Sequence, residues 1–485
     1  MSVAKAKRMI EKSVKYGSRG LMLNNIELTE LPPEIGNLEK VERLDLSHNK
    51  LVTLPPEIAL LKRLERLVLS HNKLKELPSE IGELENLAEI PLNYNKLTSL
   101  PPEIGRLKRI TELILENNQL LNLPSDIKKL KSLTTLLLAK NRITELPREI
   151  KRLKRLERLD LSQNLLKDLS TEIRKLRKLE LLDLSYNQLT QFPRTIRRLK
   201  RLITLNLAGN QFNELPPLVV KLRNLEKLNL SHNKLTVIPA EIGKLKKLER
   251  LDLSENELTE LPPQIGRLEN LKELKLSGNY LTNLPAEIGH LRQLEKLDLS
   301  HNLLTGLPAE TGQLMHLKEL DLSNSQLIGL PPEIGELKNL KTLLLSENQL
   351  TTLPPEIRLL NKLEKLDISN NQLLSLPADI GQLSKLEVLD LAYNQISELP
   401  PEIGNLLVLK RFDLSYNKLT KALPQMVGQL EGLTELALTG NYLTELPPEI
   451  SRLKKLVWFD LSGNKISNMS PELRQFLDTI EFVEL

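Results

Sequence analysis

Four of the six histidines, His48, His71, His232 and His301, stand directly before an asparagine. Histidine is a common metal ligand. A zinc site needs three or four ligands that converge on one point, whereas these four recur at one position of a long pattern. Because His48 and His71 are close enough in that pattern to lie side by side, a weak metal site is the alternative interpretation. We favour exposed surface histidines.

Other groups that support catalysis are missing from the sequence. It contains no cysteine, which excludes disulfides, thiolate nucleophiles and cysteine-ligated zinc. It contains no GxxxxGK[ST] loop for phosphate binding, and most of its glycines recur at one turn position instead. We therefore expect a protein that is not an enzyme and that requires no cofactor.

The elements that carry these residues repeat along the chain. The stretch "LERLDLSQN" at 156–164 recurs as "LERLVLSHN" at 64–72 and "LEKLNLSHN" at 225–233. A marker asparagine falls every 23 residues from Asn49 to Asn417, and then at Asn441 and Asn464, after one inserted residue near Lys421–Ala422. Ile26 and Ser325 occupy the marker position in two further coils. Such a period predicts a solenoid of about 20 coils instead of several globular domains.

Each coil has a strand half and a helical half. The pattern LxxLxL places two leucines on one side of a short strand, and the marker asparagine can donate to and accept from backbone groups at the following turn. In "LPPEIALLKRL" at 54–64, proline stands where a helical turn begins. Ile58, Leu61 and Leu64 are three residues apart, which is typical of a 3₁₀ turn. We expect the glycine that usually stands ten residues after the marker to end this turn.

The motif LPxEIGxLxxLxxLxLxxNxL resembles that of the cytoplasmic leucine-rich-repeat proteins, including the Ras-interacting intracellular ones and the repeat regions of Roco proteins. The resemblance covers residues 21–485. It implies an α/β solenoid, a leucine-rich-repeat horseshoe with a parallel concave β-sheet and short 3₁₀ or helical turns on the convex side. It also implies protein partners on the concave face, with a Ras-like small GTPase or a phosphatase among the candidates. No GxxxxGK[ST] motif follows the repeats, so we expect no attached GTPase.

The two ends of the sequence differ from the repeat. Residues 3–16 carry apolar side chains at helical spacing (Val3, Ala6, Met9, Ile10 and Val14), so residues 1–20 are predicted to form a capping helix over a solenoid of residues 21–485. At the other end, Ile480, Val483 and Leu485 fit the leucine positions of one more strand. We expect no separate C-terminal cap.

Composition and the N-terminal sequence indicate the cellular compartment of the protein. Charged residues make up 27% of the chain and hydrophobic residues 40%, with a net charge of only +5. The first 17 residues have no apolar stretch of the length that a signal peptide needs, and no run is long enough to span a bilayer. With no cysteine present, a reducing compartment is favoured, and we predict a cytoplasmic protein.

The third position of the strand is predicted to face the concave side. It holds aspartate in ten coils, and in six of them Arg or Lys stands two residues earlier, which suggests surface ion pairs on one strand. In four consecutive coils the position holds Val68, Pro91, Ile114 and Leu137 instead. Aligned apolar side chains predict a binding patch, and drift at a tolerant position is the alternative.

Aromatic residues mark a second candidate surface. Tyr94 precedes its marker asparagine, as do Tyr393 and Tyr416, and Tyr442 follows one. Tyr393, Tyr416, Tyr442 and Trp458 fall in the last four coils. Because Tyr and Trp are enriched in interface hot spots, we predict that these residues contact a partner, and shielding of the terminal coils is the alternative.

Basic residues are concentrated in one segment. Residues 124–202 contain 21 Lys and Arg against nine Asp and Glu. The usual glycine position holds Lys128, Lys151, Arg174 and Arg197 there, and Arg152 and Arg155 add to the charge. A solvated convex surface is the favoured interpretation. The alternative is an anion-binding flank, although the lack of aromatic residues among these side chains makes nucleic acid an unfavoured partner.

These observations predict a non-enzymatic protein–protein interaction scaffold or adaptor, with a protein partner on the concave face and a role in small-GTPase-linked signalling. The alternative is an electrostatic binder of anionic membrane or nucleic acid that uses residues 128–201. Salt dependence distinguishes the two, since phosphate binding weakens steeply with salt.

Overall fold

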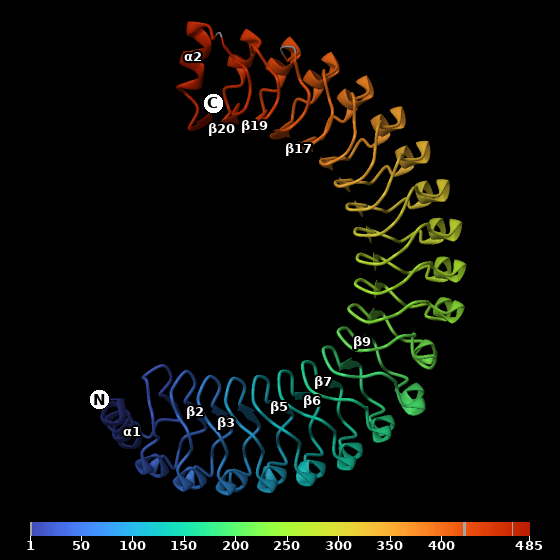
Figure 1. Ribbon diagram of the computed structural model, residues 1–485. Coiled ribbons are helices and arrows are strands. Elements are labelled where there is room, and N and C mark those ends of the chain that lie inside the picture. Colours follow the sequence, from blue (N-terminus) through green and yellow to red (C-terminus); the bar gives the residue numbers. More distant parts are fainter. Residues whose placement is uncertain (1, 421–422, 468) are drawn as a thin grey trace. The chain divides into compact units, whose positions relative to one another are not determined.

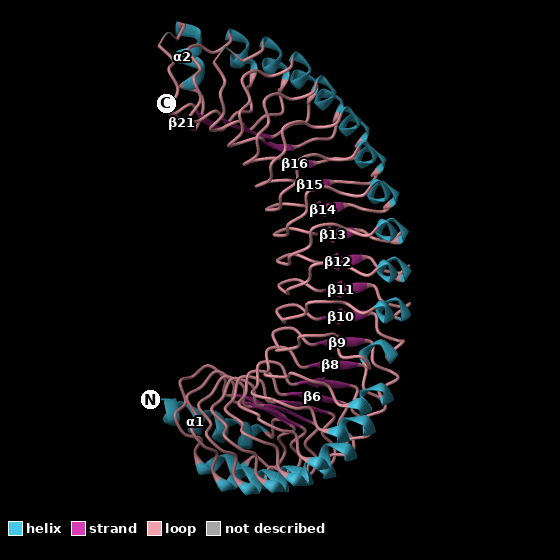
Figure 2. Cartoon of the chain, turned by 45° about the vertical axis from the view of Figure 1, so that its right-hand side comes forward, coloured by secondary structure: helices cyan, strands magenta, loops and turns pink. Residues whose placement is uncertain are grey.

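The computed structural model describes residues 2–420, 423–467 and 469–485, so the inserted residue predicted near Lys421–Ala422 lies outside the described residues. The chain consists of two compact units, residues 1–234 and 235–485. Within each unit, short parallel strands form one layer and 3₁₀ helices form a second layer on the outer side (Figures 1 and 2). The predicted α/β solenoid, with a parallel sheet on its concave side and 3₁₀ turns on its convex side, is thus confirmed for each unit.

The first unit begins with an α-helix and contains ten strands and nine 3₁₀ helices. The helix is α1 Ser2–Tyr16, and the strands are β1 Gly20–Met22, β2 Arg43–Asp45, β3 Arg66–Val68, β4 Glu89–Pro91, β5 Glu112–Ile114, β6 Thr135–Leu137, β7 Arg158–Asp160, β8 Leu181–Asp183, β9 Thr204–Asn206 and β10 Lys227–Asn229. The 3₁₀ helices are η1 Pro33–Asn37, η2 Pro56–Leu60, η3 Ser79–Glu83, η4 Pro102–Arg106, η5 Ser125–Lys129, η6 Arg148–Arg152, η7 Thr171–Lys175, η8 Arg194–Arg198 and η9 Val219–Lys221.

The second unit continues the same alternation and contains an α-helix in its last coil. Its strands are β11 Arg250–Asp252, β12 Glu273–Lys275, β13 Lys296–Asp298, β14 Glu319–Asp321, β15 Thr342–Leu344, β16 Lys365–Asp367, β17 Val388–Asp390, β18 Arg411–Asp413, β19 Glu435–Ala437, β20 Trp458–Asp460 and β21 Phe482–Glu484. Its helices are η10 Ala240–Lys244, η11 Pro263–Arg267, η12 Ala286–His290, η13 Ala309–Gln313, η14 Pro332–Glu336, η15 Pro355–Leu359, η16 Ala378–Gln382, η17 Pro401–Asn405, η18 Gln425–Gln429, η19 Pro448–Arg452 and α2 Pro471–Leu477.

The core lies between the two layers and consists mainly of leucine. Neighbouring strands pair in parallel with the 23-residue offset of the repeat, as in Leu44 opposite Leu67. From β1 to β20 the central residue of the strand and the leucine or isoleucine that follows it are buried, as are Ile58, Leu61 and Leu64 of the outer turn. In β21, Val483 is only half-buried and Leu485 is 72% exposed, so the predicted leucine positions of this last strand are not filled as in the other coils. Because every coil shares its leucine face with the next one, burial of apolar surface depends on stacking.

The marker asparagines join adjacent coils. In a typical coil, Asn233 Nδ2 donates to the carbonyl oxygens of Leu207 and Leu230 at 3.0 Å, and its Oδ1 accepts from Phe212 N at 3.1 Å. All the marker asparagines except Asn464 are buried. The predicted role of this residue, pairing backbone groups that the turn would leave unsatisfied, is confirmed.

The expected role of the repeat glycine was wrong. Gly82 lies inside η3 instead of ending it. A Cβ atom on Gly82 would lie 2.7 Å from the carbonyl oxygen of Glu103 in the next coil. Glycine is therefore used here because adjacent 3₁₀ helices approach each other closely, and not because the turn must stop.

Helix α1 packs against the first coil. Ala6 and Ile10 are buried, and Lys7 Nζ contacts Glu34 Oε1 of η1 at 2.6 Å. Val14, predicted to lie on the apolar face of this helix, is 44% exposed. The buried residue of the same turn is Ser13.

The last coil differs from the prediction at its outer side. Strand β21 forms as expected and pairs with β20, but helix α2 was not predicted. Ser470 caps it by accepting a hydrogen bond from Leu473 N at 3.2 Å, and Pro471 occupies its first turn. Leu473, Phe476 and Leu477 bury the inner face of α2. Serine followed by proline and glutamate is the sequence signal for this start.

Candidate functional site

The inner face of each unit is formed by the first and third residues of the strands. In β3 the first residue is exposed, the central residue is buried and the third is half-buried, and most strands share this arrangement. Side chains of neighbouring strands therefore form two continuous rows on this face. We call the row of third residues the inner row.

The apolar part of the inner row lies in the first unit and comprises Val68, Pro91, Ile114 and Leu137, here called the inner patch. All four are half-buried. Pro91 is opposite Ile114, and Ile114 is opposite Leu137. The inner patch occupies four adjacent strands without interruption, which places its apolar surface in one continuous band.

Pro91 changes the strand pairing at this point. Most adjacent strands share three residue pairs, whereas β3 and β4 share only that between Arg66 and Glu89. Pro91 has no N–H to donate, although its carbonyl oxygen still accepts from Leu69 N at 2.9 Å. The expected local disturbance of the sheet is therefore present.

A row of rings lies beside the inner patch. The rings of His48 and His71 stack with centroids 4.2 Å apart, and those of His71 and Tyr94 stack at 4.3 Å. The three residues precede consecutive marker asparagines and have left-handed backbones, with φ between 53° and 57°. Desolvation, followed by the charge of His48, lowers the pKa of His71. Within the described residues no three His, Asp or Glu side chains are grouped as metal ligands.

The aspartates of the inner row do not form the ion pairs expected with Arg or Lys two residues earlier. Within the described part of the chain, all of them except Asp390 are bound by the serine two residues later instead, as in Asp321 Oδ1, which accepts from Ser323 Oγ at 2.6 Å. Several basic residues at the first strand position pair with a glutamate on the next strand, for example Lys296 with Glu319 at 2.7 Å. The sequence signal was the recurring Asp-Leu-Ser, in which the serine lies closer to the carboxylate than the basic side chain does.

Asp390 has the most perturbed carboxyl group of this row. It lies between Asp367 and Asp413 on the neighbouring strands. Ala392 replaces the serine, so Asp390 Oδ1 accepts only from a backbone N–H, at 3.1 Å. Desolvation and then the two neighbouring carboxylates raise its pKa to about 6. In the first unit, desolvation also raises the pKa of Asp160.

The predicted aromatic residues of the second unit do not form one cluster. Tyr393 and Tyr416 stack with centroids 4.4 Å apart, and both are about half exposed. Tyr442 instead lies under Lys465 Nζ, which is 5.2 Å from its ring centroid. Trp458 is the half-buried first residue of β20, opposite Glu435 and Phe482. Of these four predicted residues, Tyr393 and Tyr416 are the pair whose rings stack.

The inner face of the second unit also contains a hollow of about 290 Å³, which sequence reasoning missed. It lies over strands β12 to β15 and is lined by both charges, including Lys275, Lys296, Asp298 and Asp321. Glu319, which pairs with Lys296, also lines it. The hollow is thus a polar part of this face, in contrast to the inner patch.

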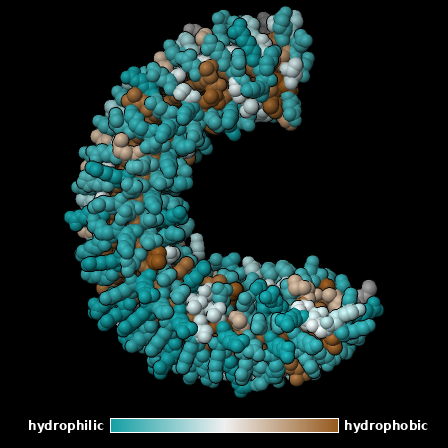
Figure 3. All heavy atoms as spheres, turned by 180° about the vertical axis from the view of Figure 1, so that it is seen from behind, coloured by the Kyte–Doolittle hydropathy of each residue, from teal (hydrophilic) through white to brown (hydrophobic). Residues whose placement is uncertain are grey.

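The predicted basic flank lies in helices η5 to η8. Lys128, Lys151, Arg174 and Arg197 each occupy the fourth residue of their helix. Glu172 pairs with Lys151 at 3.5 Å and with Arg174 at 3.7 Å. Across the described ranges, no ion pair involves Lys128, Arg152, Arg155 or Arg197. The flank therefore combines compensated and uncompensated charges. Most of the face drawn in Figure 3 is hydrophilic.

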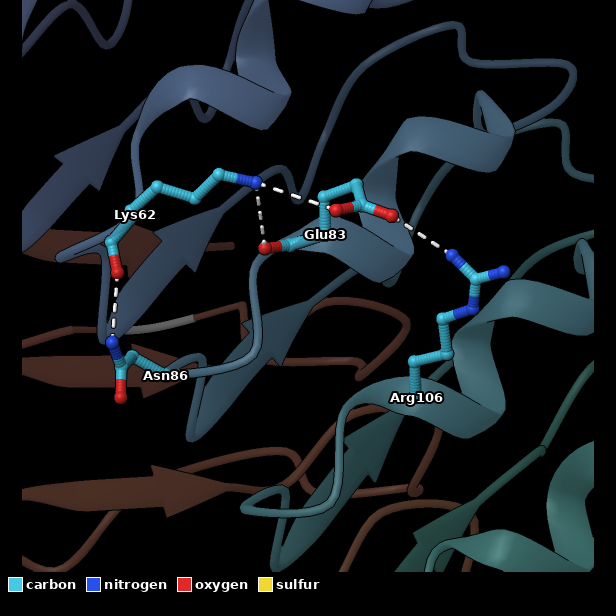
Figure 4. Close-up of polar contacts among 4 residues, drawn as sticks. All are labelled: Lys62, Glu83, Asn86 and Arg106. Atoms are coloured by element: carbon cyan, nitrogen blue, oxygen red, sulfur yellow. Dashed lines mark hydrogen bonds and ion pairs between the residues drawn. The ribbon is translucent and has the colours of Figure 1, made fainter.

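Polar contacts also connect the coils along one flank of the first unit, and sequence reasoning missed them. Glu83 accepts from Lys62 Nζ at 3.4 Å and from Arg106 Nη1 at 2.8 Å (Figure 4). Asn86 Nδ2 donates to the carbonyl oxygen of Lys62 at 2.8 Å. The same kind of bond joins Asn270 to Lys246 in the second unit. These contacts strengthen stacking and leave the inner face free.

No helix in the described residues is long and apolar enough to cross a membrane. The search among curated proteins gave no match. Residues 17–94, 227–302 and 308–395 match the family model of the leucine-rich repeat region. Further segments, at 108–166, 131–189, 166–212 and 384–443, match the leucine rich repeat model.

Solved structures show the same relationship. A leucine-rich-repeat protein of Leptospira interrogans is 42% identical over 78% of this chain and 98% of its own, with a TM-score of 0.73. The leucine-rich-repeat ectodomain of the Arabidopsis receptor kinase HAESA, in complex with an IDA peptide hormone, is 29% identical over 96% and 85%, with a TM-score of 0.67. YopM of Yersinia enterocolitica is 27% identical over 99% and 94%, with a TM-score of 0.64. The chain belongs to the leucine-rich-repeat family.

Proposed function

We propose that the protein is a non-enzymatic binding scaffold whose inner patch holds a protein partner. The observation that carries this proposal is the replacement of aspartate by Val68, Pro91, Ile114 and Leu137 on four adjacent strands. Full burial of a large apolar side chain contributes about 1.5–3 kcal/mol. Because these side chains are half-buried already, a partner gains roughly half of that from each.

The surroundings of the inner patch suit a protein partner. The stacked rings of His48, His71 and Tyr94 form an adjoining edge that is apolar on the ring faces and polar at its tips. Tyr is enriched in hot spots because it combines large contact area with a hydrogen-bonding group. In the second unit the stacked Tyr393 and Tyr416 have the same character, and we include them, with Tyr442 and Trp458, as a second contact surface.

Related folds support the choice of a protein or peptide as the ligand. The HAESA ectodomain was solved with a peptide hormone bound. The plant receptor RGFR1, 33% identical over 95% of this chain and 81% of its own with a TM-score of 0.69, was solved with RGF2. The LPxEIGxLxxL motif resembles that of cytoplasmic leucine-rich-repeat proteins, so we further propose a cytoplasmic location and a role in signalling. A Ras-like small GTPase and a phosphatase are the partners to test first.

The test is the double substitution Ile114→Asp with Leu137→Asp. We expect the melting temperature to stay almost unchanged, because both side chains point away from the leucine core, and capture of the partner in a pull-down to be lost. The partner is first identified by affinity purification and mass spectrometry with the wild-type chain. Thr204→Asp with Asn229→Asp is the matched control, since it adds two carboxylates to the same face of the same unit outside the patch. A folded double variant that still recovers the same partners would show that the inner patch is not the binding site.

A further inference from the structure

The regular stacking of the first unit is interrupted between the two coils that follow Asn187 and Asn210. A hollow of about 600 Å³ lies there between the segments that lead into η8 and η9. It is separate from the inner patch, because its lining comes from η8 and from the connections between strands and 3₁₀ helices, and not from the strands.

The two coils beside this hollow depart from the repeat at several positions. The position held by glycine in most coils is Arg197 in η8 and Val220 in η9. At the corresponding Gly105, a Cβ atom would lie 2.6 Å from the carbonyl oxygen of Asp126 in the next coil. Lys128, Lys151 and Arg174 also fill this position, and their helices still pack against the next one, so this change alone does not separate η8 from η9. Helix η9 is also shortened to three residues, and Leu218 replaces the usual glutamate before it.

The floor of the hollow is apolar. The rings of Phe192 and Phe212 meet edge to face with centroids 6.2 Å apart. Pro216 is buried and Leu218 is half-buried, and both line the hollow. An edge-to-face aromatic pair with open space beside it can accept a further ring or a large aliphatic side chain.

The rim of the hollow is basic. Arg194 and Arg197 line it and are exposed, and neither has an ion-pair partner among the described side chains. Glu214 is the one carboxylate in the lining. The hollow also adjoins the basic segment of residues 124–202, whose net charge is +12, whereas the rest of the chain carries −7. This field favours an acidic ligand.

We propose that this hollow binds an acidic peptide segment of a protein partner, which inserts one aromatic or large aliphatic side chain between Phe192 and Leu218. Carboxylates flanking that side chain pair with Arg194 and Arg197, and arginine suits carboxylates because its planar group can make two parallel hydrogen bonds. An apolar floor distinguishes this ligand from a simple polyanion, which would gain nothing from Phe192 and Phe212. In most coils glycine occupies the position of Arg197 and glutamate that of Leu218.

The experiment uses the full chain and a fluorescein-labelled peptide, Asp-Glu-Asp-Phe-Glu-Asp, with binding measured by fluorescence anisotropy at about 150 mM salt. A second peptide carries alanine in place of phenylalanine. We expect the alanine peptide to bind at least tenfold more weakly. The variant Leu218→Glu with Arg197→Gly restores the residues of the regular coils, so it should fold, and we expect it to lose the preference for phenylalanine. Lys128→Gly is the matched control, because it removes a charge at the same helix position without touching the hollow.

Three results would overturn this proposal. Equal affinity for the two peptides would show that the charge alone attracts the ligand. Failure of the wild-type chain to bind either peptide would show that the hollow is not an acidic-peptide site. Sedimentation with phosphatidylserine vesicles that depends on Leu218 and Arg197, in the absence of peptide binding, would assign the hollow to a lipid instead. None of these results bears on the inner patch, so the two proposals fail independently.

Discussion

Tyr186 covers Gly209 in the next coil so closely that a Cβ atom on Gly209 would lie 2.4 Å from the Cδ1 atom of the ring. Both residues precede a marker asparagine and have positive φ, 52° and 62°. The same relationship recurs in the second unit, where Tyr416 covers Gly440 at 2.7 Å. At these two places the tyrosine ring occupies the space that a side chain would fill, whereas Tyr393 stacks on the ring of Tyr416.

Gly209→Ala should therefore lower the free energy of unfolding. The loss should exceed the cost of placing alanine in the left-handed backbone conformation. Alanine in the left-handed region costs about 1–2 kcal/mol, and the ring of Tyr186 must also move. We expect a loss of about 2–3 kcal/mol in urea unfolding, as an order of magnitude. Addition of Tyr186→Ala should restore part of that loss, and an unchanged loss in the double variant would show that the ring contact has no role.

Asn233→Ala tests the asparagine row. The side-chain amide of Asn233 joins Leu207, Phe212 and Leu230, whose backbone groups are buried. Removal of one partner leaves these groups unpaired, so we expect a loss of about 1–3 kcal/mol. Denaturant melts with no change in midpoint would contradict this account of the marker residue.

The reverse substitution can be made at Ser325. Apart from the first coil, this is the one described coil whose marker position does not hold asparagine. The Oγ atom of Ser325 is buried and has no hydrogen-bond partner among the described residues. Ser325→Asn should supply the same bonds that Asn302 and Asn348 make in the neighbouring coils. We expect the same melts to show a gain or no change, and a clear loss would indicate that this coil has adapted to serine.

Asp390→Asn should stabilise the chain at neutral pH. Burial and the carboxylates of Asp367 and Asp413 raise the pKa of Asp390 from 3.8 to about 6. The folded state thus holds this proton more tightly than the unfolded chain does, so stability falls as the pH rises from about 4 to about 6 and stays lower above that range. Asparagine removes the charge and can still accept from Ala392 N, as Asn206 accepts from Ala208 N at 3.2 Å.

The measurement is thermal unfolding of wild type and variant at pH 4 and pH 7.5. We expect a gain of about 1 kcal/mol at pH 7.5, after allowance for solvent screening of this half-buried group, and almost none at pH 4. Asp321→Asn is the control, because the Asp321 carboxylate accepts hydrogen bonds from both Oγ and N of Ser323. We expect this variant to show no gain in stability. An equal gain at both pH values would contradict the electrostatic explanation.

The basic flank should behave as a solvated surface toward phosphate groups. Glu172 offsets Lys151 and Arg174, and the long basic stems cover apolar surface of the coils. We expect the wild-type chain not to be retained on anionic vesicles or DNA at about 150 mM salt. The variant with reversed charges at Lys151, Arg152, Lys154 and Arg155 tests the alternative. If the wild-type chain is retained and this variant is not, while its stability is unchanged, the flank binds membrane or nucleic acid electrostatically.

Part of the candidate surface could be predicted because it depends on the strand period. Alternation along a strand places Val68 and its counterparts on one face, and the 23-residue offset brings Ile114 opposite Leu137. The same offset predicted that His48 and His71 lie side by side, but not that their rings stack. The choice between a metal site and a ring stack depends on side-chain orientation, which the repeat period does not specify.

The sequence by itself determined the features that recur in most coils. The leucine spacing, the marker asparagine and the proline at the start of the outer turn each act within one coil or on the next, so their period already specifies strand, turn and core. The tertiary structure decided which of several nearby partners each polar side chain takes: Asp321 takes Ser323 instead of a basic residue, and Glu83 joins Lys62 to Arg106. It also decided where stacking is interrupted, because the hollow beside Phe192 and Phe212 depends on how two adjacent coils pack against each other.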